Sequence, residues 1–353
     1  LEEAIKNVDV SGSVVYRYNN YDDSILGGDR VDQNNYKIGL NLSSKVNDYV
    51  KFNSRFIVGQ KHTYGFTSTN AKRDQGAANT DGSADVSLSQ AYFGFTAIPN
   101  TVVNVGKQGL TTPYTVATDI NGNEQTGTGI LALSTFGPVT AGAGYFNNTN
   151  LDKSGEFAAL FDGGSDMYVA TVQGDLDFVK LEAWYAGMQN SFNSYTLAAT
   201  GNIDLAENAK LGLEARYVNL KLDNELIPGL TSDERKNSML RLAADGKVSI
   251  VNARLAYTMT DKNGGITALD QDAKNASLGW FINSLVEDAD YWQAALGADI
   301  LDNLNFTAHY GNLKTDFNNS GTDYKEQEIY GQLTYKMSKN LNTYLRYGQY
   351  TEK

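Results

Sequence analysis

The 353-residue sequence contains no cysteine, only two histidines and only four prolines. Without cysteine, the chain has no disulfide framework, no thiolate metal site and no cysteine nucleophile. It also lacks a run of about 20 consecutive apolar residues, which excludes a membrane protein built from spanning helices. Acidic side chains outnumber basic ones by 41 to 29, so the excess of positive charge that binds nucleic acid is missing as well.

Glycine, with 34 residues, and tyrosine, with 22, are more frequent than in an ordinary soluble domain. Over most of the chain, hydrophobic residues alternate with polar ones, which is the period-two pattern of strands with one apolar and one polar face. In Tyr36–Ser43, for example, one tyrosine, one isoleucine and two leucines alternate with lysine, glycine, asparagine and serine. No stretch shows a helical period over more than a few turns, so we predict an all-β fold.

Short and long connections alternate between the predicted strands. Tight turns such as Lys45–Asp48 and Gly137-Pro138 alternate with long polar connections such as Leu110–Gly129 and Asp261–Asp290. This layout is typical of an antiparallel transmembrane β-barrel, with short periplasmic turns at one rim and long extracellular loops at the other. Full charges in mid-strand on the polar face, opposite aliphatic residues, favour water inside and lipid outside over a soluble β-sandwich.

Aromatic side chains gather near the strand ends at the long-loop rim, where we expect a girdle at the membrane interface. The predicted girdle residues are Tyr18, Tyr64, Phe66, Phe95, Tyr145, Phe146, Tyr185, Tyr257 and Tyr310.

Two stretches resemble known porins. The N-terminal run Leu1–Gly12, followed by Tyr16-Arg17-Tyr18, resembles the mature N-terminus of the campylobacter-type major outer membrane protein porins. The stretches Gln90–Phe95 and Val105–Gln108 are similar to the strand pair before the constriction loop of trimeric porins in general. The resemblance implies an 18-stranded homotrimeric channel among the lipids of a bacterial outer membrane. Such a channel passes ions and small hydrophilic solutes, prefers cations and can carry Ca²⁺ at its constriction.

The residue pattern itself gives about 17 strands, whereas a barrel with both ends in the periplasm needs an even number. We therefore expect 18 strands, with 16 as the alternative, and a closing strand that is missing after residue 353. A second candidate for the further strand is Ala276–Asn283, which contains Trp280 and Phe281. No linker or composition break divides the sequence, so residues 1–353 are predicted to form a single barrel.

The connection Leu110–Gly129 follows the strand that ends in Gly106-Lys107-Gln108, where porins fold a loop into the lumen. An acidic loop against a basic wall would create a transverse field that orients dipolar solutes. The alternative is that these charges are only solvated side chains of a wet face. The residues predicted to form the constriction are Asp119 and Glu124 on the loop, and Arg17, Lys37, Lys51, Arg55 and Arg346 on the wall.

Asp119, Asn121 and Glu124 also offer oxygen atoms at short spacing, as Ca²⁺ prefers. Gly122 comes too early for an EF-hand loop, and an Asn-Gly turn explains this sequence without a metal. The calcium prediction therefore depends mainly on the resemblance, and no other cofactor is expected.

Enzymatic barrels need a histidine paired with serine or aspartate, and His62 and His309 are isolated, so we predict no catalysis. We expect a general diffusion porin with a preference for cations. Two alternatives stay open. One is a substrate-preferring channel with a sugar-stacking track of Trp184, Tyr330 and Tyr344. The other is a barrel whose loops mediate adhesion, for which the apolar run Gly279–Ile282 inside a polar connection is the candidate.

Overall fold

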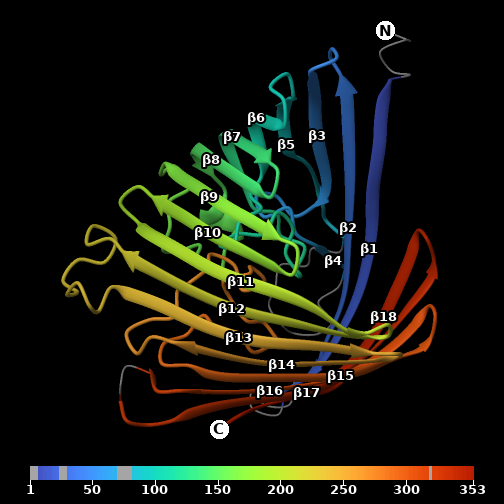
Figure 1. Ribbon diagram of the computed structural model, residues 1–353, viewed down its shortest axis with the longest axis vertical. Coiled ribbons are helices and arrows are strands. Elements are labelled where there is room, and N and C mark those ends of the chain that lie inside the picture. Colours follow the sequence, from blue (N-terminus) through green and yellow to red (C-terminus); the bar gives the residue numbers. More distant parts are fainter. Residues whose placement is uncertain (1–6, 24–29, 70–81, 318–319) are drawn as a thin grey trace. The chain divides into compact units, whose positions relative to one another are not determined.

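The computed structural model describes residues 7–23, 30–69, 82–317 and 320–353 (Figure 1). In this part of the chain, 18 strands form one antiparallel sheet, which confirms the all-β prediction. The described residues contain one short helix, α2 (Leu151–Ser154), and no helix long and apolar enough to cross a membrane. The strands are β1 (Val8–Asp22), β2 (Arg30–Lys45), β3 (Val50–Gly59), β4 (Thr67–Thr69), β5 (Asp85–Phe95), β6 (Thr101–Gly109), β7 (Thr126–Phe136), β8 (Val139–Thr149), β9 (Met167–Leu176), β10 (Val179–Met188), β11 (Phe192–Ala206), β12 (Ala209–Leu222), β13 (Lys236–Val248), β14 (Val251–Thr260), β15 (Asp290–Leu301), β16 (Leu304–Thr315), β17 (Tyr324–Ser338) and β18 (Leu341–Glu352).

The chain divides into two units, residues 1–134 with 142–167 and residues 135–141 with 168–353. In the first unit β1, β2, β3, β5, β6 and β7 pair in this order, each with the next. The three-residue strand β4 pairs with β2 at residues 34–36. In the second unit β10 to β18 pair in chain order. Both units are therefore built from antiparallel neighbours joined by hairpin connections.

The strand count depends on β4. Of the 18 strands in the described residues, β4 is the only one shorter than nine residues, so 17 long strands remain, as counted from the sequence. The segment 276–283 lies in the connection between β14 and β15 and contains only the isolated bridge Leu278–Asn283. It does not supply the further strand.

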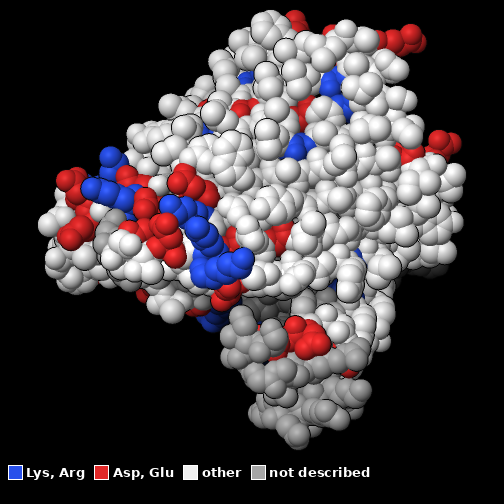
Figure 2. Space-filling model, turned by 90° about the horizontal axis from the view of Figure 1, so that it is seen from below, with Lys and Arg blue, Asp and Glu red and all other residues white. Residues whose placement is uncertain are grey.

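The strands have one polar and one apolar face, as the alternation predicts. In the pair β17 and β18, Gln332 lies opposite Arg346 on one face, and Leu333 lies opposite Leu345 on the other. Leu345 is 69% exposed, and large apolar side chains of this second face are exposed along strands of both units. Figure 2 shows wide areas without charged side chains, with lysine, arginine, aspartate and glutamate gathered in patches. Exposed apolar surface of this extent suits contact with lipid.

The polar faces are partly covered by long connections. Residues 110–125 lie on the polar face of the first unit, and residues 261–289 lie on that of the second. Tyr114 of the first connection is fully buried, and Ile282 of the second belongs to a buried cluster with Tyr291 and Leu313. The cores of the two units therefore lie between a long connection and the strands beneath it.

Exposure agrees with part of the predicted aromatic girdle. The exposed members are Tyr18, Phe95, Tyr145, Tyr185 and Tyr310. Tyr64 and Phe146 are buried, so their assignment to the girdle is wrong. The hydroxyl of Tyr64 instead accepts a hydrogen bond from Lys107 Nζ at 2.6 Å. Phe146 lies beside Gly127 and Leu110, at the two ends of the connection between β6 and β7.

Candidate functional site

The connection between β6 and β7 contains a tight turn at Asp119–Gly122. The N–H of Gly122 donates to the carbonyl of Asp119 at 3.0 Å, and the carboxylate of Asp119 accepts from the backbone N–H and the side-chain amide of Asn123. Gly122 has φ +78°, and a Cβ there would lie 2.7 Å from a ring carbon of Phe66. Because glycine adopts positive φ without strain, the Asn-Gly sequence suits this turn. The connection is shorter than predicted and ends at residue 125, since β7 begins at Thr126.

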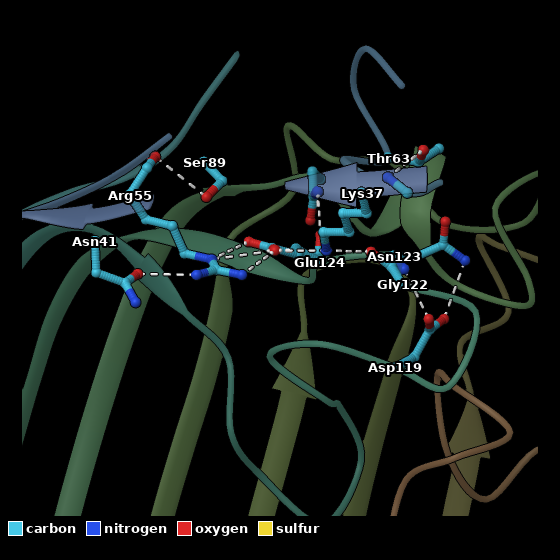
Figure 3. A network of polar contacts seen from close by, with 11 residues as sticks. Lys37, Asn41, Arg55, Thr63, Ser89, Asp119, Gly122, Asn123 and Glu124 are labelled. Carbon is cyan, nitrogen blue, oxygen red and sulfur yellow. Dashed lines mark hydrogen bonds and ion pairs between the residues drawn. The ribbon is translucent and has the colours of Figure 1, made fainter. Parts of the chain in front are cut away.

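Glu124 fixes this connection to the polar face of the first unit (Figure 3). Its side chain is fully buried, with Oε2 2.7 Å from Lys37 Nζ and 2.8 Å from Arg55 Nη2. Arg55 Nε also donates to Oε1 at 2.9 Å, which makes the arginine contact bidentate. Lys37 Nζ donates in addition to the carbonyl oxygen of Gly122 at 2.5 Å. One carboxylate therefore joins two neighbouring strands, β2 and β3, to the connection.

Arg17 is a third wall residue that contacts the same connection. Its Nη1 donates to the carbonyl oxygen of Ile120 at 2.6 Å, and its guanidinium carbon lies 4.7 Å from the ring centroid of Phe66. The structure thus brings Arg17, Lys37 and Arg55 together with the turn around Gly122, as the alternation on three neighbouring strands led us to expect.

Two of the predicted wall residues lie elsewhere. Lys51 is exposed beside the turn between β2 and β3, in a recess that Ser43 and Lys45 also line. Arg346 belongs to the second unit, where its Nε and Nη2 donate to Gln332 Oε1 at 2.9 and 2.7 Å. Neither residue makes a described contact with residues 110–125, so their part in the constriction stays a prediction.

The donor set proposed for Ca²⁺ is engaged within the protein. Both carboxylate oxygens of Asp119 accept from Asn123, and both oxygens of Glu124 accept from Lys37 or Arg55. Two cations already neutralise Glu124, so this arrangement does not fit a calcium ion that needs free anionic oxygens. The described residues contain no group of three or more histidine, aspartate or glutamate side chains that could hold a metal ion.

Two glutamates near the turn have shifted pKa values of opposite sign. Burial acts to raise the pKa of Glu124, but the hydrogen bond with Arg55 and the charge of Lys37 outweigh it, so the net shift is downward. For Glu156, in the connection between β8 and β9, burial and the nearby charge of Asp119 both raise the pKa. Glu124 is therefore held as an anion, whereas Glu156 loses its charge more readily than an ordinary glutamate.

Further residues anchor this connection. The N–H of Glu124 donates to the carbonyl of Thr63, and Asn150 Nδ2 donates to the carbonyl of Glu124 at 2.7 Å. Asn41 Oδ1 accepts from Arg55 Nη1 at 2.9 Å and orients the guanidinium. Asn41 alternates with Leu40 and Leu42, so its place on the polar face could be found from the sequence. No sequence pattern marks Asn150 as an anchor.

A second connection, residues 261–289, folds onto the polar face of the second unit, although the sequence pattern does not predict this. Glu328 of β17 accepts the backbone N–H groups of Trp280, Phe281 and Ile282 at 2.9, 2.8 and 3.3 Å. A Cβ at Gly279 would lie 1.6 Å from Glu328 Oε1, so glycine is required for this close approach.

Two arginines hold the other side of the same connection. Arg241 donates to the carbonyls of Lys274 and Ala276, both at 2.7 Å, and Arg216 Nη1 donates to Asn275 Oδ1 at 3.2 Å. In the apolar run that was considered for adhesion, Ile282 is almost fully buried, whereas Phe281 is 39% exposed.

The folding pattern agrees with known outer-membrane channels. OpdK from Pseudomonas aeruginosa superposes with a TM-score of 0.80 at 14% identity, covering 98% of this chain and 94% of that one. A BenF-like porin from Pseudomonas fluorescens Pf-5 gives 0.78 at 14% identity with 98% and 93% covered, and OccAB1 from Acinetobacter baumannii gives 0.74 at 16% with 98% and 91%. At these identities the likeness shows the fold, an 18-stranded outer-membrane porin barrel. A search of the curated proteins finds no sequence match.

The family is shown by the sequence itself. Residues 1–352, which is all but one residue of the chain, match the family described as Campylobacter major outer membrane protein. This match and the porin fold agree with the alternating strands, the apolar exterior and the loops on the polar face. The chain is a porin of the bacterial outer membrane, without enzymatic activity, and belongs to the Campylobacter major outer membrane protein family.

Proposed function

We propose that this porin is a general diffusion channel that passes ions and small hydrophilic solutes down their gradients, with a preference for cations. The observation that carries the proposal is the attachment of residues 110–125 to the polar face through Glu124, Lys37 and Arg55. A connection held by a buried, bidentate ion pair keeps a fixed position, so it can set a size limit for solutes.

The cation preference is supported by charges near the turn. Lys37 and Arg55 are occupied by Glu124, whereas Asp119 and Glu156 lie close enough for their charges to interact. Together with the net charge of −12, this pair would raise the local concentration of cations. The homotrimer is proposed from family membership alone.

The transverse field also remains a proposal, in altered form. Because Glu124 is paired with the wall, it contributes little to a field across the lumen. The acidic side would then consist of Asp119 and Glu156. The basic side would consist of Arg17 and of the one positive charge that remains when Glu124 has neutralised one of the two charges of Lys37 and Arg55. Dipolar solutes would orient between these two groups.

The reversal potential in a KCl gradient across a planar bilayer tests this function. We expect a potential of the sign for K⁺ preference, reduced by Glu156→Gln, while Glu225→Gln on the connection between β12 and β13 serves as a control of equal charge change. A reversal potential near zero in the wild-type channel would refute cation preference, and an absence of conductance would refute the open channel.

The alternative of a substrate-preferring channel receives support from one place only. Tyr330 and Tyr344 both lie within 6 Å of Arg346, counted from its guanidinium carbon to the ring centroids. Trp184, the third member of the predicted sugar track, instead donates to Glu182 at 3.4 Å on β10, seven strands from Tyr330 on β17. A continuous track of these three residues is therefore not favoured.

A further inference from the structure

Arg346 differs from the other arginines on the polar face of the second unit. Arg216 forms salt bridges with Glu182 and Glu214, Arg241 with Glu214, and Arg254 with Asp245. Among the residues that the structure describes, no carboxylate lies within 4.0 Å of the Arg346 guanidinium. Its positive charge is thus available to an anion from the lumen.

Aromatic rings and one amide surround this guanidinium. Its carbon lies 5.3 Å from the ring centroid of Trp280, 5.0 Å from that of Tyr330 and 5.7 Å from that of Tyr344. Gln332 Oε1 accepts from Nε and Nη2, whereas Nη1 has no acceptor among the described residues. Cation–π contacts hold a guanidinium in place without neutralising it, so the site is oriented and still charged.

Stacked rings continue away from this centre. The His309 ring lies 4.5 Å from Tyr330 with an interplanar angle of 12°, and Trp280 stacks on Phe281 at 5.0 Å and 26°. Tyr344 is 48% exposed, so its ring is open to solutes. His309 and Gln332 also line a recess of about 480 Å³, a volume in the range of small-ligand sites.

We propose that Arg346, Tyr330, Tyr344, Trp280 and His309 form a binding subsite for small planar carboxylates of the benzoate class. The carboxylate would accept charge-assisted hydrogen bonds from the free edge of Arg346, and the ring would stack on the exposed face of Tyr344. An uncompensated guanidinium favours an anion over the neutral sugar of the stacking-track hypothesis. The electric field of the Arg346 guanidinium is screened within about 10 Å at ordinary salt. Arg346 can therefore bind an anion without setting the ion preference of the whole channel.

The inference rests on the proposed function, because the ligand reaches the subsite through an open channel. The test uses the full chain in planar bilayers, first in KCl alone and then with millimolar sodium benzoate. We expect a saturable fall in current, and Arg346→Gln should raise the half-blocking concentration about tenfold, as expected for loss of one charge-assisted contact. Tyr344→Leu, which changes an exposed residue and keeps the charge, should raise it several-fold.

Lys180→Gln is the matched control. Lys180 is exposed and lies on the same face as Glu182, two residues along β10, so this change removes one positive charge without touching the subsite. Block by benzoate that responds equally to Lys180→Gln and Arg346→Gln would overturn the subsite in favour of a general field. Equal block by cyclohexanecarboxylate, which has the same charge but no planar ring, would overturn the stacking.

The current in KCl alone separates the two proposals. An open channel that benzoate does not block overturns the subsite and leaves the diffusion function intact. If no current flows, the diffusion function fails, and saturation-transfer NMR of benzoate with detergent-solubilised wild type and Arg346→Gln decides the subsite by itself. Signal from the wild type and its loss in the variant support the subsite, and equal signals overturn it.

Discussion

Glu124→Gln tests whether a buried ion pair holds the loop of residues 110–125. The substitution keeps the shape of the side chain but removes the charge that compensates Lys37 and Arg55. Lys37 is 5% exposed and Glu124 is completely buried, so water cannot replace the lost carboxylate. Removing one partner of a buried pair costs about 3–5 kcal/mol, mostly because a buried charge is left uncompensated.

This cost falls on the attachment of the loop. Lys37 and the two arginine nitrogens Nε and Nη2 all donate to Glu124, and glutamine offers one acceptor oxygen and an amide that repels cations. The strands keep their backbone ladders, so we expect the barrel to fold while the loop detaches. The predicted result is a larger and noisier single-channel conductance and faster proteolytic cleavage within residues 110–125.

Glu225→Gln, on the connection between β12 and β13, is the control, since it removes one exposed carboxylate that forms no described salt bridge. Unchanged conductance, noise and cleavage in Glu124→Gln would refute the reasoning, as would equal changes in the control. The pH dependence gives a second check on the wild type. Because the pKa of Glu124 is lowered below its ordinary 4.5, the stabilisation is present above pH 4.5 and is lost only as pH falls through the lower folded-state value.

Gly122→Ala should destabilise the turn by about 1–3 kcal/mol, because φ +78° strains alanine and its Cβ would clash with the Phe66 ring. Faster proteolytic cleavage within residues 110–125 would show this, and cleavage at the wild-type rate would contradict it. Acidification should weaken the cation preference already above pH 4.5, because the raised pKa of Glu156 means that this side chain loses its charge there. If the reversal potentials of the wild type and of Glu156→Gln change equally as the pH is lowered, this prediction is wrong. Glu328→Gln should weaken the second loop by about 1–3 kcal/mol through loss of a charged acceptor, seen as faster cleavage within residues 261–289, with Glu326→Gln as control. Thermal unfolding curves with and without a chelator should superimpose. A lower melting temperature in the presence of the chelator would support a calcium site.

The strands could be predicted because the environment imposes the pattern. A wall with water on one side and lipid on the other requires alternation along every strand, and the 17 long strands follow it. Arg17, Lys37 and Arg55 were placed on one face for the same reason, since they lie on three strands that pair in succession. The end of the first loop was placed four residues late, because Thr126–Gly129 contains no apolar residue that would show alternation.

The contacts of the loops could not be predicted in the same way. Glu124 contacts residues 69 and 87 positions earlier in the chain, and Glu328 contacts Trp280 across 48 positions, distances over which alternation carries no information. The apolar run Gly279–Ile282 looked like a surface feature because it stands in a polar connection. The sequence does not show that polar residues of this connection, such as Asn275, contact side chains of the strands. For Lys51 and Arg346, alternation predicts the face of the strand on which each side chain lies, but it does not predict which connection the side chain contacts.

Beside the ion pair of Glu124, both loops are held by contacts to their main chain. Lys37 and Arg17 donate to carbonyls of Gly122 and Ile120, Arg241 donates to carbonyls of two residues, and Glu328 accepts three successive N–H groups. Main-chain groups are the same for nearly every amino acid. Apart from Glu124 and the two glycines, side chains on these loops can therefore change, and with them the solutes that the channel passes, while the loops stay attached to the strands.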